Sequence, residues 1–381
     1  MQKIANEIHE ATSALTINRS PPDKNHASHP PAILDLCMAP GGFAQVALTL
    51  NPTASLRGVT LPESSSRHKI LVPNWEKDPR IQMLHCDITM LAAEMGVDLV
   101  DIPTNHPDAS GFLSSRPFHN QEFDLVFCDG VVLRTQDRHE YRDKQFEVPR
   151  LTTSQLVLAL QRIRDGGTLI MLMHRANSWQ TVSILHALNS FASIRLFKPT
   201  LGHKTRSSFY LVAQNVRPRS AAAVKAVQKW KKQWKAATFR DGPGESKDGE
   251  ALGDASKEEV VAALDEFGPK LINLAEPVFK LHVEGLSHAS FMHANSNKSK
   301  FMTNWRGREA GSDVGLGPKQ EPKLERDLNL ERGPKPMQET KWSRVSKPER
   351  ESKSEREPKP EQETKWDRGS KFDSNWRVRK I

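Results

Sequence analysis

The chain has 381 residues, which is enough for one or two domains. Only 37% of the residues are hydrophobic and the formal net charge is +9, a composition that argues against a core packed along the whole chain. There is no apolar run of about 18 residues, and the N-terminal segment lacks the apolar core of a signal peptide. We therefore expect neither a membrane span nor a secretory leader.

Residues 1–20 predict a short helix, and a proline-rich connector follows it. Short apolar runs then alternate with longer segments of helical periodicity. Near-continuous apolar strands separated by helices indicate a mainly parallel sheet that is covered on both faces. The predicted strands are 32–37, 55–61, 81–86, 123–128, 167–173, 192–197 and 208–214, and the predicted helices between them are 42–50, 150–163 and 178–191.

Two connections of this predicted sheet depart from simple alternation. The last two strands are joined by a turn-rich stretch without a helix, which predicts one antiparallel strand at the end of the sheet. A long insert, residues 98–121, lies between the third and fourth strands, and we expect its central part to be a surface loop.

We place the boundary of the sheet domain, residues 1–218, before a basic amphipathic helix, residues 219–240. Trp230 and Trp234 fall on one stripe of this helix. The stripe favours docking against the sheet domain, and a nucleic-acid-binding surface is the alternative.

The C-terminal part of the chain is more polar. Residues 241–258 have the composition of a linker, 259–297 predict a short helical extension, and 298–381 predict a disordered tail. The tail holds 22 Lys or Arg and 15 Asp or Glu, so it carries +7 and residues 1–297 carry only +2. This excess favours an acidic partner such as nucleic acid, although a soluble mixed-charge tail explains it equally well.

The tail also repeats itself. PKPMQETKWSRVSK (334–347) returns as PKPEQETKWDRGSK (358–371), and SKFMTNWRGR (299–308) returns as SKFDSNWRVR (370–379). Arginine beside an aromatic ring can combine phosphate contact with base stacking. The repeats are therefore candidate RNA-contacting or protein-docking motifs, and a duplicated, tolerated linker is the alternative.

Cys37, Cys86 and Cys128 each end an apolar run. Their odd number and their spacing fit neither a disulfide framework nor a zinc site, so we predict small buried side chains and no metal centre. Unpaired cysteines favour a reducing, intracellular compartment, either the nucleus or the cytoplasm.

The segment ILDLCMAPGGFAQVAL (33–48) joins a predicted strand to a predicted helix through a Pro-Gly-Gly turn. Such a turn presents backbone amides at an electropositive helix N-terminus, which suits a carboxylate or a phosphate. We expect Gly41 and Gly42 to let a ligand approach the backbone, and Pro40 to stiffen the turn. A dinucleotide site would require G-x-G-x-x-G, so a NAD(P)-dependent dehydrogenase is disfavoured.

DLCMAPGGF (35–43) resembles the first motif of the FtsJ-like S-adenosylmethionine (SAM)-dependent methyltransferases, which methylate the ribose 2′-hydroxyl of RNA. GVTL (58–61), CDIT (86–89) and FDLVFCDG (123–130) resemble the family's next strand ends in order, and the whole pattern looks like a fungal branch. The resemblance, over roughly residues 30–215, implies a class I methyltransferase fold: a Rossmann-like α/β sheet of seven mostly parallel strands. It also implies SAM as cofactor and RNA as partner.

The resemblance further implies roles for individual residues. Asp35 would brace the turn and the amino group of SAM, Asp87 would bind the adenine amino group, and Asp129 would lie beside the transferred methyl group. Helix capping is the alternative for the first two acids, and Glu63 is a candidate for the ribose hydroxyls. The implied cofactor-binding residues are Asp35, Ala39, Pro40, Gly41, Gly42, Phe43 and Asp87.

The family's catalytic Lys-Asp-Lys-Glu tetrad is degenerate in this sequence. Only its aspartate, Asp129, is plain, because Leu172 stands at the central lysine position and Ser208 at the glutamate position. Lys3 and Lys24 are the nearest candidates for the first lysine. Leucine can neither donate, accept nor titrate, so general acid–base assistance from the lysine is lost.

His174 offers a replacement, because it lies two residues beyond Leu172 and therefore on the same strand face. A packed histidine at a strand end is the alternative. Lys204 and Arg206 are candidates for RNA phosphate. The sequence thus predicts a SAM-dependent RNA methyltransferase with rearranged catalytic groups, Asp129 and His174, or else a catalytically silent SAM- or RNA-binding subunit.

Overall fold

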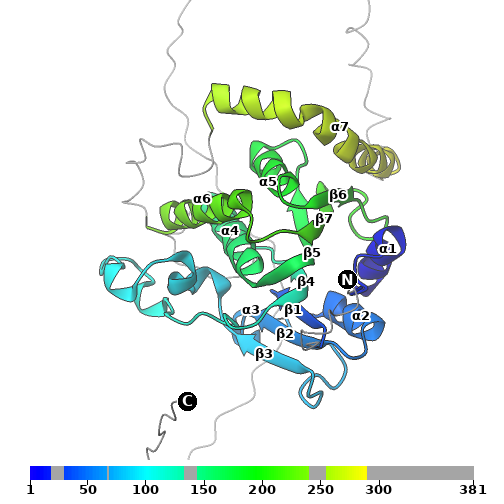
Figure 1. Ribbon diagram of the computed structural model, residues 1–381. Helices are drawn as coiled ribbons and strands as arrows, with labels where there is room; N and C mark the ends of the chain where they lie inside the picture. Colours follow the sequence, from blue (N-terminus) through cyan, green and yellow to red (C-terminus); the bar gives the residue numbers. More distant parts are fainter. Residues whose placement is uncertain (19–29, 67, 133–143, 240–254, 290–381) are drawn as a thin grey trace, which may run out of the picture. The chain divides into compact units, whose positions relative to one another are not determined.

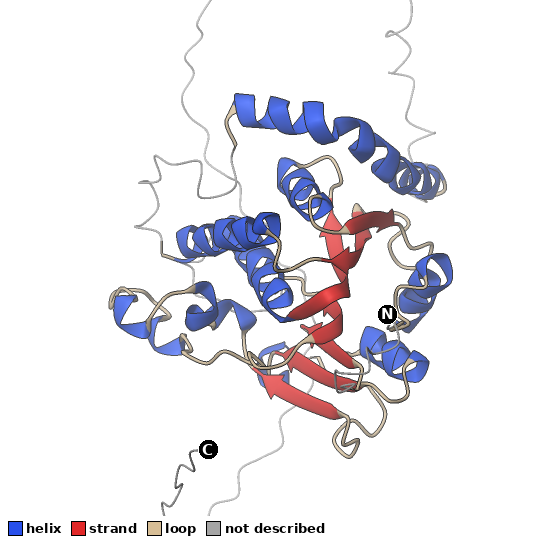
Figure 2. Ribbon diagram, viewed as in Figure 1, coloured by secondary structure: helices blue, strands red, loops and turns tan. Residues whose placement is uncertain are grey.

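A seven-stranded sheet with helices on both faces forms the centre of the protein in this computed structural model (Figures 1 and 2). This confirms the predicted fold class. The predicted tail and its repeats, and most of the predicted linker, lie outside the described residues. Within the part of the chain that is described, no helix is both long and apolar enough to cross a membrane. The described residues are 1–18, 30–66, 68–132, 144–239 and 255–289.

The strand order is β3-β2-β1-β4-β5-β7-β6, and β7 runs antiparallel to both of its neighbours. The other neighbouring pairs are parallel. The strands are β1 (Ala32–Leu36), β2 (Ser55–Thr60), β3 (Ile81–His85), β4 (Phe123–Cys128), β5 (Ile163–His174), β6 (Ser193–Phe197) and β7 (Ser208–Val216).

The antiparallel strand was predicted, but its expected position at the end of the sheet was wrong. β7 lies between β5 and β6, and β6 forms the edge. The residues of β7 are buried almost continuously, as in a strand with two neighbours, whereas β6 alternates between exposed and buried residues. A continuous apolar run marks a strand covered on both faces, and alternation suits an edge.

Two hydrophobic clusters cover the two faces of the sheet. Successive strand residues point to opposite faces, so Ile33 and Leu125 belong to one cluster and Leu34 and Val126 to the other. The first cluster is completed by α1 (Gln2–Thr12) and α2 (Gly42–Leu50), and the second by α4 (Lys144–Arg162), α5 (Trp179–Asn189) and α6 (Ala221–Thr238).

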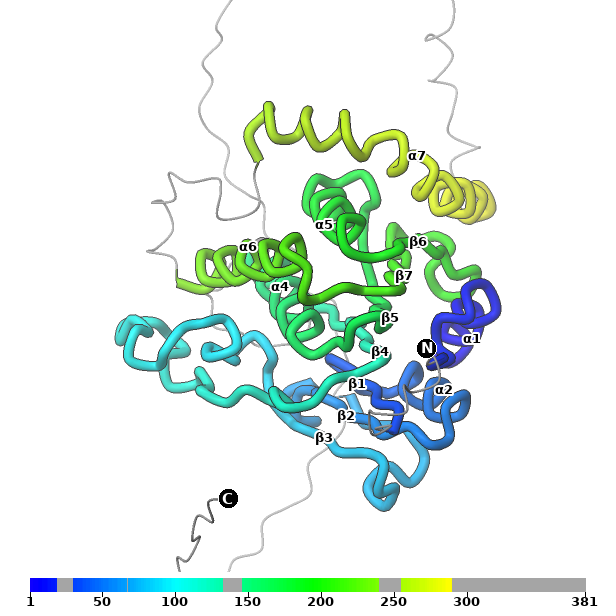
Figure 3. Tube along the Cα trace, viewed as in Figure 1, coloured from blue at the N-terminus to red at the C-terminus, as the bar shows by residue number. Residues whose placement is uncertain are grey.

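Helix α6 packs along α4 and buries both tryptophans of its stripe, as the docking interpretation expects: Trp230 is 4% exposed and Trp234 is fully buried. The insert before β4 lies beside it (Figure 3). Its central part is not wholly a surface loop, because Phe112 is 5% exposed and packs edge-on against Trp234, with ring centroids 6.2 Å apart. The expectation of a surface loop was therefore wrong for Phe112, because its aromatic ring packs against α6.

The remaining segments are short turns and one long helix. Helix α7 (Lys257–Ser287) contacts α5 and β6, and it accounts for the expected helical extension as a single helix. The short elements are α3 (Glu63–Ser66) and the 3₁₀ turns η1 (Ile88–Met90), η2 (Ala92–Met95), η3 (Leu99–Asp101) and η4 (Ala109–Gly111).

Candidate active site

A pocket of about 310 Å³ opens where the parallel strands end. Cys37 follows β1, Asp87 lies just beyond β3, Asp129 follows β4, and His174 ends β5; all of them line it. Because β7 runs the opposite way, its first residue, Ser208, reaches the same edge. Ligands of open α/β sheets bind outside the carboxyl ends of the strands, so the fold brings the predicted strand-end residues to a binding crevice.

The Pro-Gly-Gly turn forms part of the wall, since Ala39 and Pro40 line the pocket. Asp87 also lines the pocket, and its carboxylate caps η1 by accepting hydrogen bonds from the backbone N–H (2.9 Å) and hydroxyl (2.6 Å) of Thr89. The capping and ligand-binding interpretations of Asp87 are therefore compatible. Glu63 does not line the pocket, and its exposed carboxylate lies 3.5 Å from Lys69.

The structure shows a packing reason for the two glycines. A Cβ atom on Gly41 would lie 2.6 Å from Cγ2 of Val72, and one on Gly42 would lie 2.5 Å from Cβ of Met1. Gly41 also adopts a left-handed backbone, with φ of 92°, at the start of α2. Close packing of the protein against itself thus requires glycine at both positions, and neither residue lines the pocket.

Phe43 and Asp35 also lie outside the pocket lining. Phe43 is a core residue, 3% exposed, with its ring 5.2 Å from that of Phe127 and 5.4 Å from that of Tyr210. Asp35 is 2% exposed, and burial, followed by repulsion from Asp129, raises its pKa well above the usual range. Phe43, Asp35 and the two glycines do not line the pocket. Their direct contact with a cofactor therefore stays a prediction, and the position of the pocket does not favour it.

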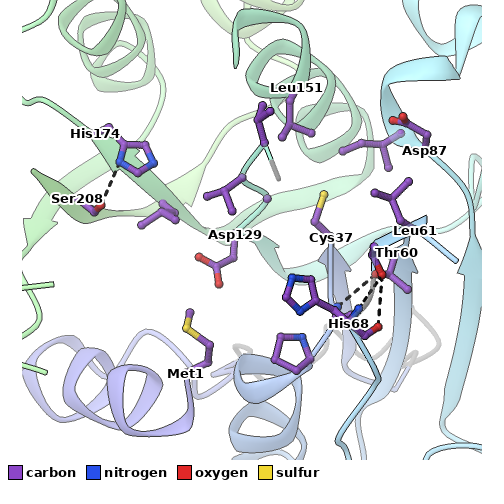
Figure 4. Close-up of a pocket in the computed structure, with 18 of the residues that line it drawn as sticks. Met1, Cys37, Thr60, Leu61, His68, Asp87, Asp129, Leu151, His174 and Ser208 are labelled. Carbon is purple, nitrogen blue, oxygen red and sulfur yellow. Dashed lines mark hydrogen bonds between the residues drawn. The ribbon is translucent and has the colours of Figure 1, made fainter. Parts of the chain in front are cut away.

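Asp129 lies between the two sides of the pocket, with Asp87 and Leu61 on one side and His174 and Ser208 on the other (Figure 4). The hydroxyl of Tyr210 donates a 3.0 Å hydrogen bond to Asp129 Oδ1. Burial raises the pKa of Asp129 to about 7, and the hydrogen bond from Tyr210 opposes this rise. The carboxyl group therefore titrates near neutral pH, where a general base works best.

Leu172 and His174 line the same pocket, as their spacing on one strand face predicts. Nδ1 of His174 and Oγ of Ser208 are 3.0 Å apart and share a hydrogen bond across the β5–β7 pair. Burial, and then the charges of Arg175 and Lys198, lower the pKa of His174, so its ring is neutral near pH 7.

Neither candidate for the first lysine of the tetrad is found among the described residues of the pocket. Lys3 is exposed on α1 and does not line the pocket. Lys24 lies outside the described residues. Among the described residues that line the pocket there is no lysine.

Sequence reasoning missed several residues of this site. His203 lines the pocket with its ring edge-on to Tyr210, at 6.1 Å between centroids. Lys198 is buried under the same connection, where its ammonium group donates hydrogen bonds to the carbonyls of Arg206 and Ser208, and burial lowers its pKa to about 8. Tyr210 was predictable in principle, because it lies two residues from Ser208 on the same face of β7.

The two candidates for binding RNA phosphate, Arg206 and Lys204, have different surroundings. Arg206 lines the pocket. Lys204 instead forms an ion pair of 2.7 Å with Glu284 of α7, so its ammonium group serves a contact between the loop and that helix.

Comparison with known proteins identifies proteins to which the chain is similar. The chain is 28% identical over 200 residues to a cap-specific mRNA (nucleoside-2′-O-)-methyltransferase of Autographa californica nuclear polyhedrosis virus, which covers 50% of this chain and 67% of the relative. Among solved structures, it is similar to TrmN from Thermus thermophilus (14% identity, TM-score 0.31, covering 56% of this chain and 48% of that one) and to the N-methyltransferase NodS from Bradyrhizobium japonicum (13%, 0.32, 56% and 97%). The sequence profile of the FtsJ-like methyltransferases matches residues 7–216, more than half of the chain. The protein therefore belongs to the FtsJ-like methyltransferase family.

Proposed function

We propose that this SAM-dependent methyltransferase methylates a ribose 2′-hydroxyl of RNA. The observation that carries the proposal is the position of Asp129, a titrating carboxyl group between two chemically different sides of one pocket. The viral relative, whose name describes 2′-O-methylation of mRNA, supports the same substrate class.

The side formed by β1, β2 and β3 fits the cofactor. It combines the backbone turn at Ala39 and Pro40, the apolar side chains of Leu61 and Ile88, and the carboxylate of Asp87. A mostly apolar wall with a few placed polar groups is typical of nucleoside-sized ligands. When bound, SAM supplies an electrophilic methyl group on its sulfonium sulfur.

The side formed by β5 and β7 fits the substrate. Arg206 provides a permanent positive charge for a phosphate, while His174 and His203 have lowered pKa values because of burial and neighbouring cations. The two rings are therefore neutral near pH 7 and can accept or donate hydrogen bonds to a ribose or a base.

Asp129 is the base in the proposed reaction. Tyr210 holds Oδ1 by a hydrogen bond, which leaves Oδ2 to accept the proton of the ribose hydroxyl as its oxygen forms a bond to the methyl carbon. Bound SAM would supply the methyl carbon, and its sulfur would keep the electron pair of the carbon–sulfur bond that breaks. The arrangement assigns to the carboxyl group the task that the family's lysine performs, because Leu172 cannot titrate.

A second surface supports RNA as the partner. The outward face of α6 carries Lys225, Lys229 and Lys232, which are exposed and take part in no ion pair among the described residues. These positions are four and three residues apart, so they share one face of the helix. A row of unpaired ammonium groups is suited to the phosphates of a polyanion.

The test is methyl transfer itself. Wild-type protein incubated with SAM labelled in the methyl group should transfer label to unmethylated RNA, and nuclease digestion should yield 2′-O-methylated nucleosides. Asp129→Ala should reduce the label by about 10²-fold or more. Base-methylated nucleosides, or equal labelling by wild type and variant, would rule out the proposed function.

A further inference from the structure

The turn that carries Asp87 is held from behind by two buried side chains. The backbone carbonyl of Thr89 accepts a hydrogen bond of 3.2 Å from Nε1 of Trp234 and one of 3.1 Å from Nη2 of Arg150. The same threonine donates two hydrogen bonds to the carboxylate of Asp87. One residue therefore links the pocket acid to donors from α4 and α6.

Packing fixes these donors in place. Trp234 is fully buried and Arg150 is 2% exposed. The guanidinium carbon of Arg150 lies 5.9 Å from the ring centroid of Trp234 and 5.7 Å from that of Phe112, within the range of cation–π attraction. A buried carbonyl that lost a donor would lack full hydrogen bonding, so the turn would relax.

Helix α6 lies beyond the segment that matches the family profile, which ends at residue 216. Its contact with the turn therefore adds a support to the site from outside the matched domain. Simple docking of an accessory helix would need only apolar contacts. Trp234 instead donates a hydrogen bond to Thr89, which itself binds Asp87. This contact points to an influence of α6 on the position of Asp87 in the pocket.

We propose that Trp234 is a positioning residue of the SAM site, which acts through Thr89 to hold the carboxylate of Asp87 toward the adenine end of the cofactor. The proposal rests on SAM as cofactor and on contact between SAM and Asp87, and not on the identity of the methyl acceptor. Binding of SAM without RNA therefore tests it separately from the proposed function.

The experiment compares Trp234→Phe with Trp230→Phe in the full chain. Both residues are buried in α6, but of these two tryptophans it is Trp234 that donates a hydrogen bond to Thr89. Calorimetric titration with SAM should give a Kd about 3- to 10-fold higher for Trp234→Phe, the range expected for one buried hydrogen bond, and an unchanged Kd for Trp230→Phe. Equal changes in the two variants would mean that α6 supports only general stability, and would overturn the proposal.

A double-mutant cycle with Asp87→Asn separates positioning from stability. If Trp234 acts through Asp87, its replacement should raise the Kd much less in the Asp87→Asn background than in the wild type. Independent, multiplicative effects would contradict the pathway through Thr89. Thermal unfolding measured in parallel shows that each variant is folded.

Hydrogen exchange on the wild-type protein keeps the proposal testable if Trp234→Phe fails to fold. Added SAM should slow amide exchange in the peptide around Thr89 and also in the half of α6 that contains Trp234. Protection confined to the first peptide would overturn the proposal, whereas a wild type that binds no SAM at all would overturn the assignment of the site.

Discussion

The hydroxyl of Tyr210 in β7 donates a 3.0 Å hydrogen bond to Oδ1 of Asp129, which follows β4, two strands away in the sheet. Burial favours the neutral form of this carboxyl group, and the hydrogen bond favours the ionised form. The balance leaves the pKa at about 7, so Asp129 can exchange a proton under physiological conditions.

Replacing Asp129 by asparagine should stabilise the protein while abolishing activity. The folded pKa of about 7 exceeds 3.8, the ordinary pKa of an aspartate, so the folded protein retains a proton that the unfolded chain has released, and stability falls as the pH rises between these values. Asparagine removes this loss. We expect the free energy of unfolding at about pH 8 to rise by on the order of 4 kcal/mol, and methyl transfer to fall by about 10²–10⁴-fold.

Thermal or denaturant unfolding at pH 5 and at pH 8 measures this effect, with wild type as the reference. The gain should be smaller at pH 5, because Asp129 is still protonated in the folded protein there and only part of the loss between pH 3.8 and about 7 has occurred. A variant that is destabilised at pH 8 would show that the ionised carboxylate is a structural requirement rather than a cost.

Tyr210→Phe should shift the pH dependence of the reaction. Wild-type activity should rise with pH up to about 7 and then level off, because the carboxylate is the active form. Loss of the hydroxyl removes a hydrogen bond that lowers the pKa of Asp129, so the midpoint should move to higher pH. Rates measured across the pH range at saturating SAM check this, and an unshifted midpoint would argue against Asp129 as the titrating group.

His174→Ala should lower the turnover of bound RNA without weakening SAM binding. The imidazole lies on the substrate side of the pocket and is neutral near pH 7, so its loss should reduce kcat by about 10-fold or more while the Kd for SAM stays the same. Ser208→Ala is the matched control, since it removes only the hydrogen bond to Nδ1 and should have a smaller effect. Full activity of His174→Ala would assign the histidine to packing at the strand end.

Asp87→Ala should weaken SAM binding by about 10-fold or more, because a carboxylate that accepts a hydrogen bond from a bound ligand is worth roughly 1.5–3 kcal/mol. Asp98→Ala is the control, since Asp98 is exposed and does not line the pocket. Calorimetric titration with SAM gives both values. Equal affinities for the two variants would move the adenine contact to another residue.

Neutralising the lysine face of α6 should reduce the salt dependence of RNA binding. If Lys225, Lys229 and Lys232 each contact one phosphate, the triple glutamine variant should lower the slope of log K against log salt by about 2. The control is a triple glutamine variant of the exposed lysines Lys77, Lys257 and Lys270. Similar slopes for both variants would indicate that RNA approaches by another surface.

Strand-end residues were the part of the site that local pattern predicted well. The order of apolar runs located the strands to within a few residues, and the acids and histidine at their ends converge because parallel strands share a carboxyl edge. Ala39, Pro40, Asp87 and Asp129, which the family resemblance singled out, and His174, which strand-face spacing singled out, all line the pocket.

The residues that support the site from outside the pocket could not be predicted from local sequence pattern. The hydrogen bond between Trp234 and Thr89 joins residues 145 positions apart, and hydrophobic periodicity shows that a helix face is apolar without showing what covers it. The pKa of Asp129 likewise depends on burial by the folded chain.

Periodicity and strand-end chemistry are local properties, so the sequence alone determined the sheet and the polar groups at its strand ends, and the family resemblance added the identity of the SAM motifs. The tertiary structure decided what packs against Gly41 and Gly42, where β7 lies, and that α6 reaches the turn that carries Asp87. These depend on which distant segments come into van der Waals contact, and that is fixed by packing of the whole domain.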